Sequence, residues 1–277
     1  MNPKLEGFPS CYVINLEEAK DRREYMKEQF NKYGIKNYHI KQFKRFDDAN
    51  LCVKAPQDVV DVLAIGLTTS HLLMIKWWYE NTTEDMCAIM EDDCDFELIQ
   101  HWNFKFSEYI KQFGPLWDAI QLSVVHEGWP VMAPRVRDPW DHGLQCYIIK
   151  RHYAKKIVEY YFNQGAHNII SIRMAWCQRE PLMIKLKPTP ENIVLGLGHV
   201  YTHPIFNHNV HDFKSMNPTD NVGLAKRQHE NSESTYVYVK EWWEKIGTNS
   251  TLEQLFDYEH CCPAHTNQKF MYIPIDV

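Results

Sequence analysis

The fold is decided by residues 11–43, which read CYVINLEEAKDRREYMKEQFNKYGIKNYHIKQF. The apolar run over 11–16 predicts a short strand that is buried on both faces. A charged segment over 17–33 follows with apolar residues at helical spacing, and Gly34 stands where a helix commonly ends. A second extended run at 38–43 comes at once. The chain therefore opens with a predicted β-α-β unit.

The same alternation continues through about the first 165 residues. Apolar runs predict strands at 86–90, 117–123 and 146–149. Helices are predicted near 69–79, 104–113 and 151–162. This order predicts an α/β fold with a mostly parallel sheet and helices on both faces.

The rest of the chain is less regular. The Pro- and Gly-rich stretch 125–143 is predicted to be a long loop. Further on, we expect an extended His-rich segment at 200–209, a polar loop at 215–234 and a short helix at 241–246.

Charge and hydropathy exclude several classes of protein. The 277 residues hold 30 Lys and Arg against 36 Asp and Glu, a net charge of −6, which argues against a nucleic-acid partner. No apolar run is long enough for a transmembrane segment, and the first residues do not resemble a signal peptide. We therefore expect a cytoplasmic location, in a bacterium or in a host cell infected by a virus.

An acidic motif directly follows the predicted strand 86–90. Glu91, Asp92, Asp93 and Asp95 repel one another, so a fold that gathers them usually supplies a cation. At the carboxyl end of a parallel strand, such a group faces the crevice in which α/β proteins bind ligands. The expected chemistry is a divalent ion that also binds phosphates. A solvated acidic turn is the alternative.

Several segments resemble, in the same order, the glycosyltransferases of family 25. This family contains lipopolysaccharide sugar transferases and the procollagen galactosyltransferases. The resemblance covers roughly residues 10–215. It rests on residues 13–16, 21–23, Ser70-His71, Glu91-Asp92-Asp93 after a strand, 117–122 and 147–156.

The resemblance implies a GT-A type fold, with a Rossmann-like nucleotide-sugar domain over 1–215. Residues 216–277 would be an irregular C-terminal extension packed on the same domain. The acidic motif would hold Mn²⁺ or another divalent cation, which neutralises the diphosphate leaving group. The candidate metal ligands are Asp93, then Asp95, with His208 and His211 from the segment 204–215.

The resemblance also points to residues that would contact the UDP-sugar donor. Arg22 and Arg23 can alternatively form a solvated helix face, Ser70 can be a helix N-cap, and His71 can be a packed core residue. The candidates are Asn15, Leu16, Arg22, Arg23, Ser70, His71, Glu91 and Asp92.

The acceptor side is less defined. Family members often carry Pro-Val-Asp near residues 166–168, where this chain has Ala-His-Asn, and Asn168 cannot act as a base. The loop 125–143 offers Glu127, Asp138, Asp141 and His142, of which Asp141 joins Asp93 as a candidate catalytic residue. Trp129 and Trp140 in this loop can stack on a sugar ring or simply pack the loop.

These features lead to one main hypothesis. It is a metal-dependent transferase that moves a hexose, galactose or glucose, from a UDP-sugar to a glycan, glycoprotein or collagen-like hydroxylysine acceptor. The alternative is a non-catalytic nucleotide-sugar or carbohydrate-binding protein on a degenerate transferase scaffold. A phosphotransferase is disfavoured because the chain has no Gly-rich phosphate loop.

Overall fold

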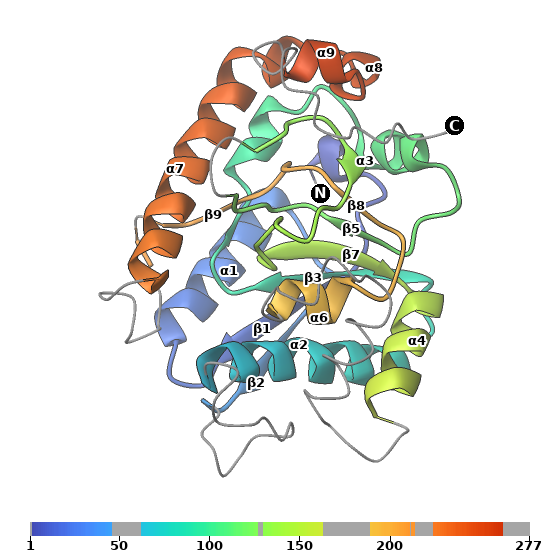
Figure 1. Ribbon diagram of the computed structural model, residues 1–277, viewed down its shortest axis with the longest axis vertical. Helices are drawn as coiled ribbons and strands as arrows, with labels where there is room; N and C mark the ends of the chain where they lie inside the picture. The colour runs from blue at the N-terminus through green and yellow to red at the C-terminus, as the bar shows by residue number, and fades with distance from the viewer. Residues whose placement is uncertain are drawn as a thin grey trace.

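A seven-stranded sheet forms the centre of the computed structural model (Figure 1). The structure describes residues 2–45, 62–126, 130–162, 189–210, 212–213 and 224–262, with the backbone alone for 62–65 and 224–229. The strand order is β2-β1-β3-β7-β5-β8-β6. These strands are β1 (Cys11–Leu16), β2 (Tyr38–Phe43), β3 (Met86–Glu91), β5 (Ala119–Gln121), β6 (Arg135–Val136), β7 (Cys146–Lys150) and β8 (Val200–Thr202).

The sheet is mixed but mostly parallel, as the sequence predicts. Strands β2, β1, β3, β5 and β8 run in one direction, whereas β7 and β6 run in the other. Parallel neighbours need a long crossover, usually a helix. No helix lies in the described part of 122–145, and β7 accordingly pairs with β5 and β3 in the antiparallel sense.

Helices cover both faces of the sheet (Figure 1). On one face, Val13 of β1 shares a core with Met26 and Phe30 of α1. On the other, Ile14 shares a core with residues of three helices, such as Ile75. Successive residues of β1 thus pack against the helices on opposite faces of the sheet, as expected for a strand buried on both faces. The helices are α1 (Lys20–Tyr33), α2 (Val62–Asn81), α3 (Phe106–Tyr109), α4 (Arg151–Tyr161), α6 (Pro190–Leu195), α7 (Leu224–Lys245), α8 (Leu252–Leu255) and α9 (Tyr258–Cys261).

The opening unit agrees closely with its prediction. The strands 11–16 and 38–43 have the predicted bounds, and α1 ends at Gly34, whose φ of 69° is left-handed. Glycine adopts this conformation without the steric penalty that a side chain would bring.

The start predicted for the helix near 69–79 is wrong, because α2 already begins at Val62. Ser70 therefore lies inside the helix and is not an N-cap. Its hydroxyl donates to the Gly66 carbonyl oxygen at 3.0 Å, four residues earlier. This bond gives the hydroxyl group a hydrogen-bond partner inside the helix, as is common for serine at such positions. The predicted helix 104–113 is also interrupted, since Ile110–Phe113 forms a 3-10 turn, η3, after α3.

The polar loop predicted at 215–234 is wrong over its second half, because α7 begins at Leu224 and runs on to Lys245. The first half of this helix lacks the apolar periodicity that indicates a helix. Its last turns bring Trp243 into the same core as Leu5, and the Trp243 indole donates to the Pro204 carbonyl oxygen at 2.8 Å. In the described chain, no helix has the length and apolarity needed to cross a membrane.

Short elements complete the fold. A separate two-stranded antiparallel sheet pairs β4 (Cys94–Asp95) with β9 (Asn207–His208) and so connects the acidic motif with the His-rich segment. The 3-10 helices are η1 (Pro3–Leu5), η2 (Glu97–His101), η3 (Ile110–Phe113) and η5 (Gly247–Asn249).

Candidate functional site

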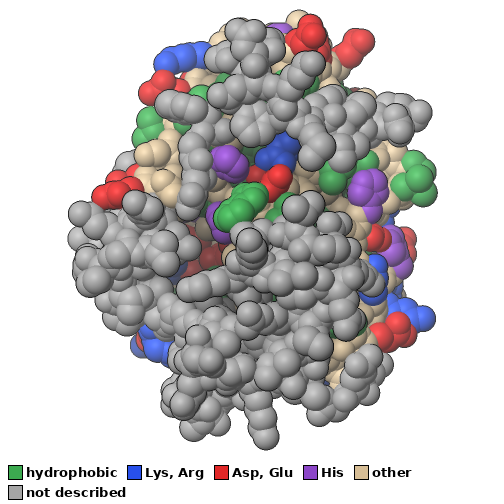
Figure 2. Space-filling view, viewed as in Figure 1, with side chains coloured by type: hydrophobic (Ala, Val, Ile, Leu, Met, Phe, Trp, Pro, Cys, Tyr) green, Lys and Arg blue, Asp and Glu red, His purple; other side chains and the backbone are tan. Residues whose placement is uncertain are grey.

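The candidate site lies where strands β1 and β3 end side by side. After β1 the chain passes through α1 to β2 on one side of β1, whereas after β3 the next strand of this sheet along the chain, β5, lies on the other side, beyond β7. A crevice forms where neighbouring connections diverge in this way, outside the carboxyl ends of the strands. Acidic, basic and histidine side chains gather in the middle of the face seen in Figure 2.

One guanidinium joins two carboxylates of the acidic motif. Arg22, in the first turn of α1, places Nη1 3.1 Å from Asp92 Oδ1 and 3.1 Å from Asp93 Oδ2. All three side chains are largely buried. The Phe213 ring covers the guanidinium, with its centroid 5.2 Å from Cζ. The helix after β1 and the turn after β3 therefore meet at Arg22.

Asn15 connects the end of β1 to the same motif. Its Nδ2 donates to Asp92 Oδ2 at 2.7 Å and to the Ala19 carbonyl oxygen at 2.9 Å. Its Oδ1 accepts a hydrogen bond of 2.8 Å from Arg23 Nη1. The structure thus brings the predicted donor-side residues Asn15, Arg22, Arg23 and Asp92 together in one network, with Leu16 adjoining it at the end of β1.

Negative charge exceeds positive charge in this network. Burial, together with Asp92 and Glu191, raises the pKa of Glu91 to about 8. Burial and Glu91 raise the pKa of Asp93 to about 7, although Arg22 opposes the shift. The pKa of Asp92 is also raised, mainly by burial. Three carboxyl groups therefore share one guanidinium, and a further cation would stabilise their ionised forms.

The donor atoms of the acidic motif fit a divalent cation shared with phosphates. Asp93 Oδ1 is buried, and it has no hydrogen-bond partner among the described residues. No three His, Cys, Asp or Glu side chains in the described part of the chain lie close enough to hold a metal by themselves. Cations such as Mg²⁺ are usually bound by one or two carboxylates and substrate phosphates rather than by a complete protein cage. Asp93 suits that arrangement.

The other predicted ligands have different surroundings. Asp95 Oδ1 accepts a hydrogen bond of 2.7 Å from the Glu97 backbone N–H, the first N–H of η2, whose N-cap residue is Phe96. His208 lies on β9 opposite Cys94, and the neighbouring Asn209 backbone N–H donates to the Asp93 carbonyl oxygen at 2.8 Å. The His-rich segment therefore does reach the acidic motif. His211 lies outside the described residues.

His71 lies behind Glu91 in the core. Its Nδ1 is 2.9 Å from the Tyr147 hydroxyl oxygen, and its Nε2 is 3.5 Å from Glu91 Oε1. Burial lowers the pKa of His71 to about 3, so the imidazole is neutral at physiological pH. His71 is thus a packed core residue beside Glu91, and its Nε2 has no hydrogen-bond partner among the described residues. Ser70 bonds within its own helix instead.

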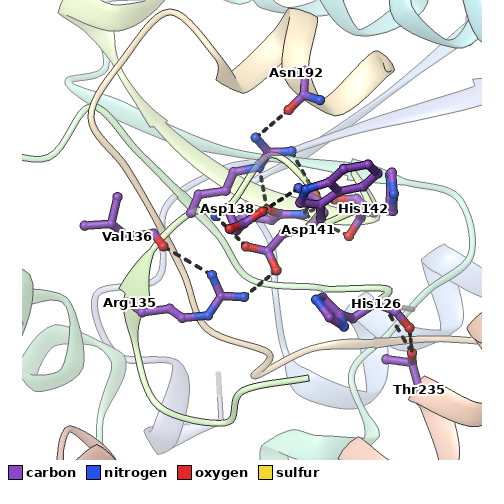
Figure 3. A network of polar contacts seen from close by, with 12 residues as sticks. His126, Arg135, Val136, Asp138, Asp141, His142, Asn192 and Thr235 are labelled. Atoms are coloured by element: carbon purple, nitrogen blue, oxygen red, sulfur yellow. Dashed lines mark hydrogen bonds and ion pairs between the residues drawn. The ribbon is translucent and has the colours of Figure 1, made fainter. Parts of the chain in front are cut away.

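Asp141 holds the loop that precedes β7 (Figure 3). Its Oδ1 is paired with Arg135 Nη2, and its Oδ2 accepts a hydrogen bond of 2.7 Å from the Asp138 backbone N–H. The side chain is fully buried. A base must come within hydrogen-bond distance of the acceptor hydroxyl. Since both oxygens are engaged, the geometry supports a structural role for Asp141.

Several residues of this region were absent from the sequence-based candidates. Gln121 Oε1 accepts from Arg137 Nε at 2.9 Å, and Arg137 Nη1 donates to Asn192 Oδ1 at 2.9 Å. Glu191 reaches the loop from α6 and contributes to the pKa shift of Glu91. Thr189-Pro190-Glu191 is a typical helix start, but nothing local in it indicates proximity to Glu91. Glu127, Trp129 and Asn168 lie outside the described residues.

Comparison with known proteins gives no assignment: no family model matches the chain, and no curated protein matches its sequence. The fold and the site together define a mixed α/β protein with a mostly parallel sheet. Its buried carboxyl groups lie at the carboxyl ends of the parallel strands β1 and β3, the end of such sheets at which ligands commonly bind.

Proposed function

We propose that the protein is a glycosyltransferase of the GT-A type, similar to family 25. It would transfer galactose or glucose from a UDP-sugar to a glycan or to a hydroxylysine-type acceptor of a collagen-like protein. The observation that carries this proposal is the buried surplus of carboxylates at the ends of β1 and β3, gathered around the single guanidinium of Arg22.

The chain's own residues would bind and orient the donor. Asn15 and Arg22 fix the Asp92 carboxylate, which leaves a rigid acceptor for sugar or ribose hydroxyl groups. The Arg22 guanidinium, at the ends of β1 and β3, would be suited to a phosphate oxygen of the donor. Asp93, through its Oδ1, would hold Mn²⁺ or another divalent cation. When bound, that cation would neutralise the charge of the diphosphate leaving group.

Transfer also requires removal of a proton from the acceptor hydroxyl. We propose that Asp141 contributes by fixing the loop before β7, because its oxygens are held by Arg135 and by the backbone of Asp138. In this proposal Asp141 has a positioning role, and another group accepts the proton.

The direct test is Mn²⁺-dependent release of UDP from UDP-galactose and UDP-glucose, measured with and without glycan and collagen-like acceptors. Asp93→Asn should reduce turnover by about a hundredfold or more, as expected when a main electrostatic contact is lost. Asp257→Asn, at the exposed N-cap of α9, is the matched control. UDP-sugar binding without turnover in the unmodified chain would favour the binding-protein alternative. An active Asp93→Asn variant would exclude the metal role.

A further inference from the structure

The loop over 137–143 is fixed by an unusual number of polar contacts (Figure 3). The Gln121 amide nitrogen donates to the carbonyl oxygens of His142, at 3.0 Å, and of Gly143, at 2.6 Å. Arg137 Nη2 donates to the Asp141 carbonyl oxygen at 2.8 Å. Asn192 Nδ2 donates to the Pro139 carbonyl oxygen at 3.1 Å. The backbone of this loop is therefore held from β5 and from α6 at the same time.

Trp140 stands at the exposed end of this fixed loop. Its side chain and backbone are 52% exposed, although tryptophan is usually well buried. Its backbone N–H donates to Asp138 Oδ1 at 2.9 Å, which closes a tight turn with an exposed carboxylate two residues before the tryptophan. The indole is thus not buried as loop packing would require. It is an exposed aromatic surface on a loop whose backbone is held by Gln121, Arg137 and Asn192.

The loop lies beside the acidic motif. Gly143 N–H donates to Glu191 Oε1 at 2.9 Å, and Glu191 contributes to the raised pKa of Glu91. In the backbone, Glu91 N–H donates to the Gln145 carbonyl oxygen at 3.1 Å. Because β7 is antiparallel to β3, the start of β7 lies beside the carboxyl end of β3. The residues that lead into β7 therefore arrive at the same end of the sheet as the acidic motif.

We propose that Trp140 is the stacking platform for a pyranose ring of the acceptor, at a subsite built by the loop 137–143 and clamped by Asn192 and Glu191. The inference rests on the proposed function, which places the donor sugar at the neighbouring acidic motif. An indole packs against the apolar face of a sugar ring, and the exposed Asp138 carboxylate can accept hydrogen bonds from ring hydroxyl groups. A platform that is already rigid loses little conformational entropy on binding.

The test measures binding of methyl β-galactoside, methyl β-glucoside and N-acetylglucosamine by saturation-transfer NMR and titration calorimetry. Trp140→Ala should weaken the binding of at least one of these sugars by about tenfold, equivalent to about 1.4 kcal/mol. Trp140→Phe should retain most of the affinity, because the ring face remains. Leu116→Ala is the matched control, since Leu116 is an apolar side chain that is 81% exposed.

This experiment distinguishes failure of the Trp140 proposal from failure of the proposed glycosyltransferase function. Unchanged sugar binding by Trp140→Ala, an equal loss in Leu116→Ala, or no binding of any of the three sugars to the unmodified chain would each overturn the inference. UDP binding is measured in parallel and should be unaffected by Trp140→Ala. Sugar binding through Trp140 in a chain that binds no UDP would refute the donor site and retain the platform.

Discussion

Arg22 Nη1 lies 3.1 Å from Asp93 Oδ2, and the same nitrogen lies 3.1 Å from Asp92 Oδ1. A single guanidinium from the first helix thus compensates two carboxylates that follow the third strand. Burial lowers the pKa of Arg22, but Asp93 and Asp92 outweigh this effect and raise it. The arginine is therefore a fixed positive charge within the candidate donor site.

Arg22→Gln should lower the free energy of unfolding by about 3 kcal/mol at neutral pH, because it leaves buried carboxylates without their partner. The loss should be larger at pH 8.5 than at pH 7, because more of the Asp93 and Glu91 carboxyl groups, whose pKa values are about 7 and about 8, carry charge there. Urea unfolding at both pH values measures this. Arg45→Gln removes an exposed ion pair with Glu18 and should cost at most about 1 kcal/mol. Equal losses in the two variants would contradict the role assigned to Arg22.

The Asp95→Asn variant distinguishes two roles for Asp95, as a hydrogen-bond acceptor at the start of η2 or as a metal ligand. The amide oxygen of asparagine can still accept the Glu97 N–H, so the acceptor role predicts nearly unchanged stability and UDP release. Asp95→Ala should cost about 1 kcal/mol of stability through loss of this hydrogen bond. A severe loss of Mn²⁺-dependent UDP release in Asp95→Asn, with stability unchanged, would instead make Asp95 a ligand.

Asp141→Ala should destabilise the chain by about 3 kcal/mol or more, since it leaves the Arg135 guanidinium without its buried partner. In Asp141→Asn, kcat per folded molecule should stay within about tenfold, while KM for the acceptor rises as the loop loosens. Thermal unfolding and steady-state kinetics provide the two readouts. A fall in kcat of about a hundredfold or more at an unchanged acceptor KM would identify Asp141 as the base after all.

His203 makes stability depend on pH. Burial lowers its pKa from 6.5 to about 3, so the folded chain keeps the ring neutral. Below pH 6.5 the unfolded chain binds a proton that the folded chain does not, and stability falls as the pH falls. The slope from this group approaches about 1.4 kcal/mol per pH unit. In urea unfolding between pH 7 and 4.5, His203→Gln should show a slope smaller by that amount. Identical slopes would contradict the assignment.

Local patterns in the sequence predicted the first β-α-β unit, including Gly34 at the end of α1. The family resemblance named Asn15, Arg22 and Asp92 only as separate candidates for contact with the donor, and their hydrogen-bonded network was not predicted. The direction of β7 was missed, since an apolar run such as 146–149 is the same in either direction. The absence of a predicted helix between 123 and 146 was the available signal.

Other features depend on contacts between distant segments. Ser70 resembled an N-cap because a hydroxyl residue preceded an apolar run, and only its bond to the Gly66 carbonyl oxygen reveals a helix interior. Glu191 is a hundred positions from Glu91 in the chain, so no spacing could indicate that they are neighbours. The polar start of α7 has no apolar stripe from which to predict a helix.

The reversed direction of β7 has an evolutionary consequence. Residues that would recognise the donor come from the ends of β1 and β3, whereas Trp140 lies in the chain that enters β7, on a loop held from β5 and α6. In the proposed enzyme, insertions, deletions or exchanges within the loop 137–143 would therefore alter which acceptor is bound, while the residues proposed to bind the nucleotide stay in register. A sheet of this kind allows the two specificities to diverge separately, and loop-exchange chimeras would follow the same division.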